Sequence, residues 1–160
     1  MTERVHAFSY LAPENHRHAI VFDIGVGVSL PIPNAPKDLK GRLTIKALVD
    51  TGASGSAISE RFAKCVQLSS YRRMIVHAAN GDSIVPVYTV DVFLPNGVVF
   101  QNTNVSEFSG GSDFDFIIGM DILMQGDLSI TNANNQTLFS FRMPPDSQHT
   151  DYTKLQETVI

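Results

Sequence analysis

The chain has 160 residues, of which 43% are hydrophobic and 18% are charged, a composition typical of an ordered globular protein rather than a disordered one. Its length predicts one domain, and a net charge of −4 with no basic cluster larger than Arg72-Arg73 argues against a nucleic-acid partner. The single cysteine, Cys65, excludes an intramolecular disulfide, and no apolar run approaches the roughly 20 residues that a membrane-spanning helix needs, so no membrane partner is expected.

Residues 1–18 show no sustained hydrophobic periodicity and are expected to form an N-terminal arm that lies against the body or stays mobile. The arm lacks the apolar stretch of a secretory signal, which favours a cytoplasmic location. His16 and His18 stand close together, but no cysteine or carboxylate pair lies nearby to complete a metal site. We therefore expect no metal and no cofactor.

The first strand is predicted over residues 19–30, a stretch rich in β-branched residues with glycines at bulge-like positions. Pro31, Pro33 and Pro36 then require an extended loop, because proline restricts its own φ and the conformation of the residue before it. A second strand, over residues 42–49, delivers Asp50 at its end.

The segment Asp50-Thr51-Gly52-Ala53 is the first candidate functional site. Placing an ionised carboxylate at the end of a hydrophobic strand costs several kcal/mol unless its oxygens find hydrogen-bond donors. Gly52 permits a tight turn that brings backbone N–H groups close to this carboxylate. The alternative is an ordinary polar turn, because Asp, Thr and Gly are all common turn residues.

A short helix is predicted over residues 60–67, with Ser56 and Ser59 as candidate N-caps. Its apolar residues recur four apart, so one face of the helix should pack under the Asp50 loop. Cys65 falls on this helix and is interpreted as a packed thiol.

Two hairpins are predicted next along the chain. The β-prone runs within residues 74–88 are separated by Asn80-Gly81, which predicts a type I′ turn at these two residues. A strand over residues 87–94 then turns at Pro95-Asn96-Gly97 into residues 98–100.

A second candidate segment follows, where a buried-looking strand over residues 114–118 stops at Gly119 and leads into a short helix. Asp113 and Asp115 are interpreted as a solvated strand edge rather than a cation site, because two carboxylates without further oxygen ligands do not make one. A closing hairpin is expected to pair residues 128–130 with residues 137–141. Residues 144–160 are expected to form a polar tail.

Together, Asp50-Thr51-Gly52-Ala53 and Ile117-Ile118-Gly119 resemble the two motifs of the retropepsin-like aspartic proteases. The continuation Gly-Met-Asp-Ile-Leu at residues 119–123 is more similar to cellular members of the Ddi1 type than to the retroviral enzymes. The resemblance covers roughly residues 19 to 142. It implies a mainly β, single-domain closed β-barrel (the acid protease fold) over residues 19–143, with one or two short helices, that functions as a C2 homodimer.

The resemblance also implies roles for individual residues. Asp50 corresponds to the catalytic carboxylate, and the hairpin of residues 74–88 corresponds to the flap that folds over bound peptide. The residues expected to support the active-site loop are Thr51, Gly52, Ile118 and Gly119. Those expected to contact substrate are Ala53, Ser54, Ala79, Asn80, Gly81 and Asp82. Ser54 and Gly55 stand where retroviral enzymes carry acidic side chains, so the substrate preference of those enzymes does not transfer.

Peptide hydrolysis in this family needs two carboxylates about 3 Å apart that share one proton, and this chain supplies one. The expected function is therefore a homodimeric aspartic endopeptidase that pairs two copies of Asp50 and acts on polypeptides. The alternative is a catalytically silent peptide-binding or dimerisation module, because a fold does not guarantee an activity.

Overall fold

The computed structural model describes residues 4–14, 18–27, 42–78, 81–109 and 113–154. Within these residues the chain is mainly β, with two short α-helices. The strands are β1 (His6–Leu11), β2 (Val21–Gly27), β3 (Arg42–Val49), β4 (Ala57–Ser59), β5 (Arg72–Ala78), β6 (Gly81–Phe93), β7 (Val99–Phe108), β8 (Phe116–Ile118), β9 (Asp127–Ala133) and β10 (Gln136–Met143). The helices are α1 (Glu60–Cys65) and α2 (Met120–Leu123), and a 3-10 turn, η2, spans Tyr152–Lys154.

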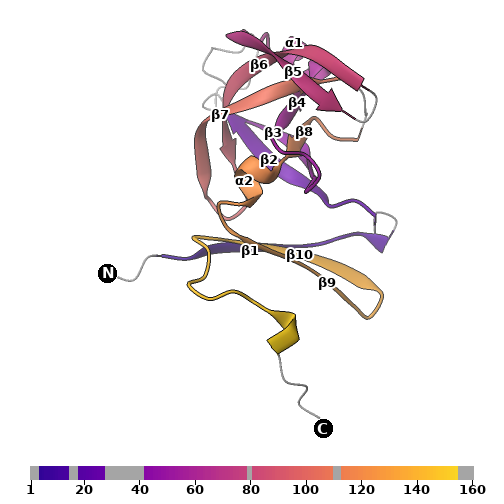
Figure 1. The fold of residues 1–160 in the computed structure, drawn as a ribbon, viewed down its shortest axis with the longest axis vertical. Coiled ribbons are helices and arrows are strands. Elements are labelled where there is room, and N and C mark those ends of the chain that lie inside the picture. The colour runs from indigo at the N-terminus through magenta and orange to yellow at the C-terminus, as the bar shows by residue number, and fades with distance from the viewer. Residues whose placement is uncertain (1–3, 15–17, 28–41, 79–80, 110–112, 155–160) are drawn as a thin grey trace.

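The larger of two sheets has seven strands in the order β2-β3-β8-β4-β7-β6-β5 and forms the upper part of the molecule in Figure 1. β2 pairs with β3 along its length and, through residues 25–27, also with β6. The β3–β8 and β4–β7 pairings are parallel, whereas the other pairings of this sheet are antiparallel. Parallel partners need a long connection, and here this topology brings Val49 beside Ile118.

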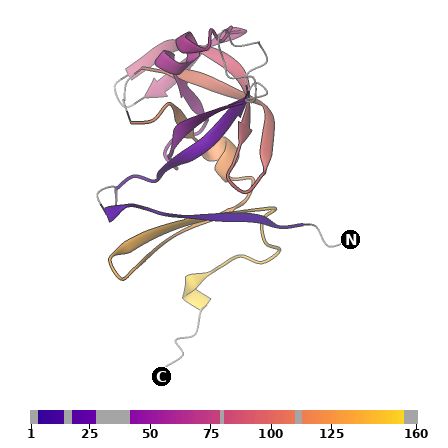
Figure 2. The same cartoon turned by 180° about the vertical axis from the view of Figure 1, so that it is seen from behind.

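The smaller sheet has the order β1-β10-β9 and lies beneath the larger one, as both views show (Figures 1 and 2). Aromatic rings join the two sheets. The ring of Phe22 in β2 lies with its centroid 5.2 Å from that of Phe8 in β1 and 5.8 Å from that of Phe139 in β10. Since Phe22, Phe139 and Phe141 are all buried, one hydrophobic core extends across the contact between the sheets.

β1 lies within residues 1–18, where the sequence predicts no strand. It pairs antiparallel with β10 from His6 opposite Met143 to Leu11 opposite Leu138. Its six residues alternate between half-buried and exposed, a pattern too short to stand out as a period in the sequence. The domain boundaries at residues 19 and 143 stay a prediction.

Most other elements lie where the sequence predicts them. β3 spans the predicted residues 42–49, and β2 lies inside the strand predicted over residues 19–30. α1 begins at the predicted residue and ends at Cys65, before the predicted end at residue 67. Cys65 is exposed, so its interpretation as a packed thiol is wrong.

One of the predicted hairpin turns differs from the expectation in register, whereas the turn of the closing hairpin does not. In the β5–β6 hairpin Ala78 already pairs with Gly81, whose φ is +110°, so the predicted turn at residues 80 and 81 is shifted by one position. The intervening Ala79 and Asn80 lie outside the described residues. In the closing hairpin β9–β10, the turn residues Asn134 and Asn135 have φ values of 49° and 64°, the positive angles that a type I′ turn requires.

Candidate active site

The Asp50 loop begins where β3 and β8 end side by side. The parallel ladder aligns Ala47 with Phe116 and Val49 with Ile118. It continues one step further, since the backbone N–H of Asp50 donates to the carbonyl of Ile118 at 3.0 Å. Ile118 is buried, so the predicted support residue anchors the start of the loop through its backbone.

The Asp50 carboxylate is held by its own turn. The backbone N–H of Gly52 donates to Asp50 Oδ1 at 2.8 Å, and the N–H of Ala53 donates to the Asp50 carbonyl at 3.3 Å. A backbone N–H donor fixes the direction in which a carboxylate points. Asp50 remains partly accessible, which leaves it available to a molecule in the adjoining groove.

Gly119 allows the Asp50 loop to lie directly against the start of α2. A Cβ atom at Gly119 would lie 2.5 Å from the carbonyl carbon of Gly55, a separation that real Cβ contacts do not show. The close approach lets the N–H of Met120 donate to the carbonyl of Ala53 at 2.8 Å. Glycine at position 119 is therefore required for the two predicted motifs to pack together.

Ser56 ties the end of this loop to α2. Its hydroxyl donates to Asp121 Oδ1 at 2.7 Å and accepts from the N–H of Gly119 at 3.1 Å. Ser56 is buried, at 2% exposure, and so is its hydrogen bond with Gly119, whereas Asp121 is exposed and its bond to Ser56 is only partly buried. The sequence proposes Ser56 only as a helix cap, and its bridging role follows from tertiary packing that no local pattern encodes.

The N-cap of α1 is Ser59, the other candidate. Its hydroxyl accepts from the N–H of Phe62 at 3.0 Å and donates to Asp115 Oδ1 at 2.5 Å. Arg61 Nη2 lies 2.8 Å from each oxygen of Asp115. The interpretation of Asp115 as a solvated strand edge is therefore wrong, because its carboxylate links β8 to α1.

A groove of about 780 Å³ opens over the Asp50 loop. One side is formed by Asp50 with residues 52–57, together with Ile117 of β8. The other side is formed by residues 72 and 74–77 of β5, with Val87 of β6, and β7 contributes residues 104 and 106–108. The groove thus brings together the β5–β6 hairpin and three kinds of predicted site residue: the catalytic Asp50, the loop-support residue Gly52, and the substrate-binding residues Ala53 and Ser54.

The other predicted site residues lie elsewhere. Thr51 is exposed and borders a different hollow, which His18–Ile20 and Ile130 also line. Gly81 and Asp82 are exposed at the start of β6, where His77 Nδ1 lies 2.7 Å from Asp82 Oδ1. Ala79 and Asn80 fall outside the described residues.

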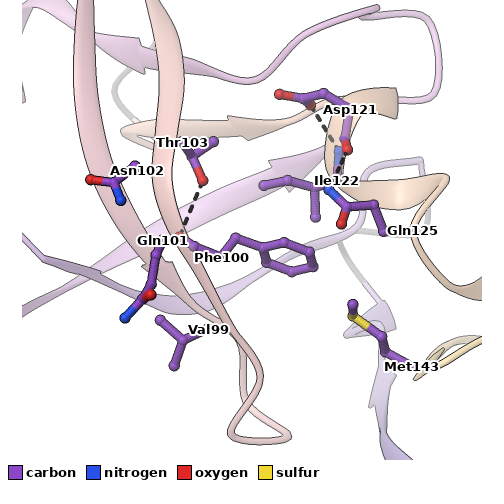
Figure 3. Close-up of a pocket in the computed structure, with 9 residues that line it drawn as sticks. All are labelled: Val99, Phe100, Gln101, Asn102, Thr103, Asp121, Ile122, Gln125 and Met143. Atoms are coloured by element: carbon purple, nitrogen blue, oxygen red, sulfur yellow. Dashed lines mark hydrogen bonds between the residues drawn. The ribbon is translucent and has the colours of Figure 1, made fainter.

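A third hollow lies between β7 and α2, away from the Asp50 groove (Figure 3). Residues 99–103 border one side, and Asp121 and Ile122 of α2, with Gln125 just after this helix, border the other. Figure 3 shows Asp121 at the upper end of this hollow, with its hydrogen bond to the N–H of Ile122. The same carboxylate binds Ser56 at the end of the Asp50 loop. This hollow therefore lies next to the contacts that hold the loop and not at the loop itself.

Among the described residues, no group of three or more His, Cys, Asp or Glu side chains stands close enough to hold a metal ion. In the same part of the chain, no helix has the length and apolar character to cross a membrane.

Comparison with known proteins places this geometry in a family. Residues 37–125 match the family described as gag-polyprotein putative aspartyl protease, and the matched stretch contains both motifs. The chain belongs to this aspartyl protease family. The resemblance inferred from Asp50-Thr51-Gly52-Ala53 and Ile117-Ile118-Gly119 is thereby confirmed.

Two solved structures are similar to the chain, and the first of them resembles it in fold. A retropepsin-like aspartic protease from Rickettsia conorii is similar with a TM-score of 0.53 and 19% identity, over 89% of this chain and 98% of that one. The retroviral protease-like domain of Ddi1 from Leishmania major gives a TM-score of 0.42 and 18% identity, over 72% of this chain and 90% of that one. No protein of curated function matches the sequence significantly.

Proposed function

We propose that this protein is a homodimeric aspartic endopeptidase in which two Asp50 carboxylates, one from each subunit, activate a water molecule. The observation that carries the proposal is the Asp50 carboxylate itself. It accepts a hydrogen bond from the N–H of Gly52 at 2.8 Å and borders a groove of about 780 Å³ that β5, β6 and β7 also line. The family match over residues 37–125 supports the same chemistry.

Two carboxylates about 3 Å apart cannot both ionise, so the pair holds one proton. The ionised member removes a proton from water, which attacks the peptide carbonyl. The protonated member donates its proton to the leaving amide nitrogen as the C–N bond breaks. Each chain contributes one such carboxylate, so a single subunit is expected to be inactive.

The remaining predicted residues receive roles in this proposal. Thr51 is exposed beside Asp50, which suits a hydroxyl that binds the loop of the partner subunit. Ala53 and Ser54 border the groove and contact the peptide backbone, and residues 79–82 cover the peptide as the tip of a flap. The pairing of β2 with both β3 and β6 supports a closed barrel behind the site.

The experiment that tests the proposal is digestion of a denatured protein mixture from mildly acidic to neutral pH, with and without pepstatin. We expect fragments that the inhibitor suppresses, and we expect Asp50→Asn to abolish them while the protein remains dimeric by size-exclusion chromatography. Asp23→Asn, at an exposed position in β2 that pairs with Lys46, is the matched control and should cleave as the wild type does.

Cleavage that survives in Asp50→Asn would remove Asp50 from the mechanism. Peptide binding without fragments in the wild type would instead favour the silent peptide-binding module.

A further inference from the structure

Arg72 borders the Asp50 groove, and its guanidinium forms no ion pair within the part of the chain that the structure describes. Arg72 is the first residue of β5. It pairs across the sheet with Val87, which pairs with Ser106, which in turn pairs with Ala57. Cross-strand partners project from the same face of a sheet, and these four residues all border the groove. Ile75 and His77, on the other face of β5, also border it, so the position of Arg72 is defined by its row of partners and by the groove together.

The guanidinium of Arg72 makes no ion pair with any carboxylate of the described residues. Its recorded contact is with the ring of its neighbour Tyr71, whose centroid lies 5.5 Å from the guanidinium carbon. The adjacent Arg73 belongs to the opposite face and donates to the carbonyl of Ile84 at 3.4 Å. Arg61 and Arg142, by contrast, each bind an aspartate.

The other charged groups bordering the groove are already engaged or are the proposed catalytic centre. His77 lies 2.7 Å from Asp82, on the same hairpin. Glu107 accepts a hydrogen bond from the hydroxyl of the buried Tyr88 at 2.5 Å. Tyr88 and Glu107 flank Val87 and Ser106 on their strands, so the Glu107 carboxylate is directed away from the face that carries Arg72. Among the described residues that border the groove, Arg72 is thus the positively charged side chain that is free to bind a ligand.

Position along β5 sets which part of a peptide Arg72 can reach. It lies six residues before Ala78, about 20 Å along the strand from the hairpin end at 3.3 Å per residue. Met74 and Val76, on the same face and nearer the tip, border the groove with apolar side chains. Apolar contacts thus lie close to the tip and the charge lies toward the far end.

We propose that Arg72 is a specificity-determining residue that binds an aspartate or glutamate side chain of the peptide, several residues from the bond that is cut. A carboxylate matches the two parallel N–H donors of a guanidinium, a match that no neutral side chain supplies. The proposal rests on the proposed function, since it names the class of peptide that the same groove accepts. In a C2 dimer each groove end carries one Arg72, so acidic residues are selected on both sides of the cleaved bond.

The test begins with digestion of a peptide library and identification of the cleavage sites by mass spectrometry. We expect acidic residues to be enriched at a fixed distance from the cleaved bond. Two synthetic peptides that differ only by Glu or Gln at that position then give the ratio of their kcat/KM values, expected to be about ten for the wild type. Arg72→Gln should bring the ratio to about one. Arg72→Glu should cleave a peptide with Lys at the same position faster than the Glu peptide.

Arg73→Gln is the matched control, because it removes a neighbouring positive charge from the opposite face; it should keep the wild-type ratio. Cleavage without acidic enrichment, or an unchanged ratio in Arg72→Gln, would overturn the role of Arg72 while leaving the proposed protease function intact. If the wild type cuts no peptide, the protease function fails. In that case the preference is tested by binding instead of cleavage. Two fluorescent apolar peptides that differ only by Glu or Gln at one position are titrated with the wild-type protein, and equal affinities for the two peptides would overturn the inference.

Discussion

At the scale of single residues, Ser56 is the side chain on which the Asp50 loop depends most. Ser56→Ala would leave the N–H of Gly119 and one oxygen of Asp121 without their buried partner. We expect a loss of about 1–3 kcal/mol in the free energy of unfolding, because an unsatisfied buried donor costs its full desolvation penalty. Urea denaturation measures this loss. Ser54→Ala, at an exposed position of the same loop, is the control and should change stability by less than about 0.5 kcal/mol.

Tyr88 gives stability a defined dependence on alkaline pH. Burial, followed by the hydrogen bond to Glu107, raises the pKa of Tyr88 to about 12 from an ordinary value of 10.0. Since the folded state holds this proton more tightly, the stabilisation is complete below pH 10 and is lost as pH rises toward 12. We expect the free energy of unfolding to fall by at most about 2–3 kcal/mol over this range.

Chemical denaturation of Tyr88→Phe at several pH values tests the assignment, because this variant should lack that part of the alkaline decline. Tyr10→Phe, which removes a hydroxyl with no hydrogen bond among the described residues, should retain it. An identical decline in wild type and Tyr88→Phe would show that other groups cause it.

Single residues also show where prediction from sequence stops. The Asp50 motif could be recognised because an aspartate, a threonine and a glycine in succession carry both the charge and the turn that positions it. Ser56 and Asp115 could not, because their partners Asp121 and Ser59 lie 65 and 56 residues away in the chain. Arg72 appeared only as half of a basic pair, since the sequence does not show that it and Arg73 face opposite sides of the β5–β6 hairpin.

At the scale of elements, strands with a long local pattern were predicted well. β3 has eight residues and ends at a charged turn, so both its extent and its end were clear. β1 was missed because its pairing with β10 decides its structure more than its own six residues do. The register of the β5–β6 turn was wrong by one residue, because Gly81 takes its positive φ inside the ladder rather than in the turn.

The packing of β1 leads to a prediction. The Phe8 ring lies with its centroid 5.2 Å from that of Phe22, 6.0 Å from that of Phe139 and 6.2 Å from that of Phe141. Phe8→Ala should lower the free energy of unfolding by about 2–4 kcal/mol, because it removes a ring that joins the two sheets. Thermal and urea unfolding measure the change.

Ser9→Ala, on the other face of β1, serves as the control and should cost far less, since Ser9 is exposed and its hydroxyl bonds only the Ser140 hydroxyl, at 2.8 Å. Equal losses in the two variants would mean that β1 does not dock through Phe8.

At the scale of the whole molecule, the proposed catalytic centre is divided between two chains. Mixing wild-type protein with a growing excess of Asp50→Asn, followed by subunit exchange, should therefore reduce activity below the value that simple dilution gives. The physical reason is that a mixed dimer holds one carboxylate and one amide, which cannot share a proton in the required way. Measured cleavage rates should follow the square of the wild-type subunit fraction, whereas a linear dependence would mean that each subunit works alone.

The parallel alignment of β3 with β8 has a consequence for how the protein is made. Asp50 leaves the ribosome long before the residues that hold its loop, since Ser56 and Asp121 are separated by 65 positions. A nascent chain that has not yet reached residue 121 therefore carries the proposed catalytic aspartate without the hydrogen bonds that hold its loop to α2. The site that we propose for hydrolysis can therefore form only after Asp121 has been synthesised and has bound Ser56.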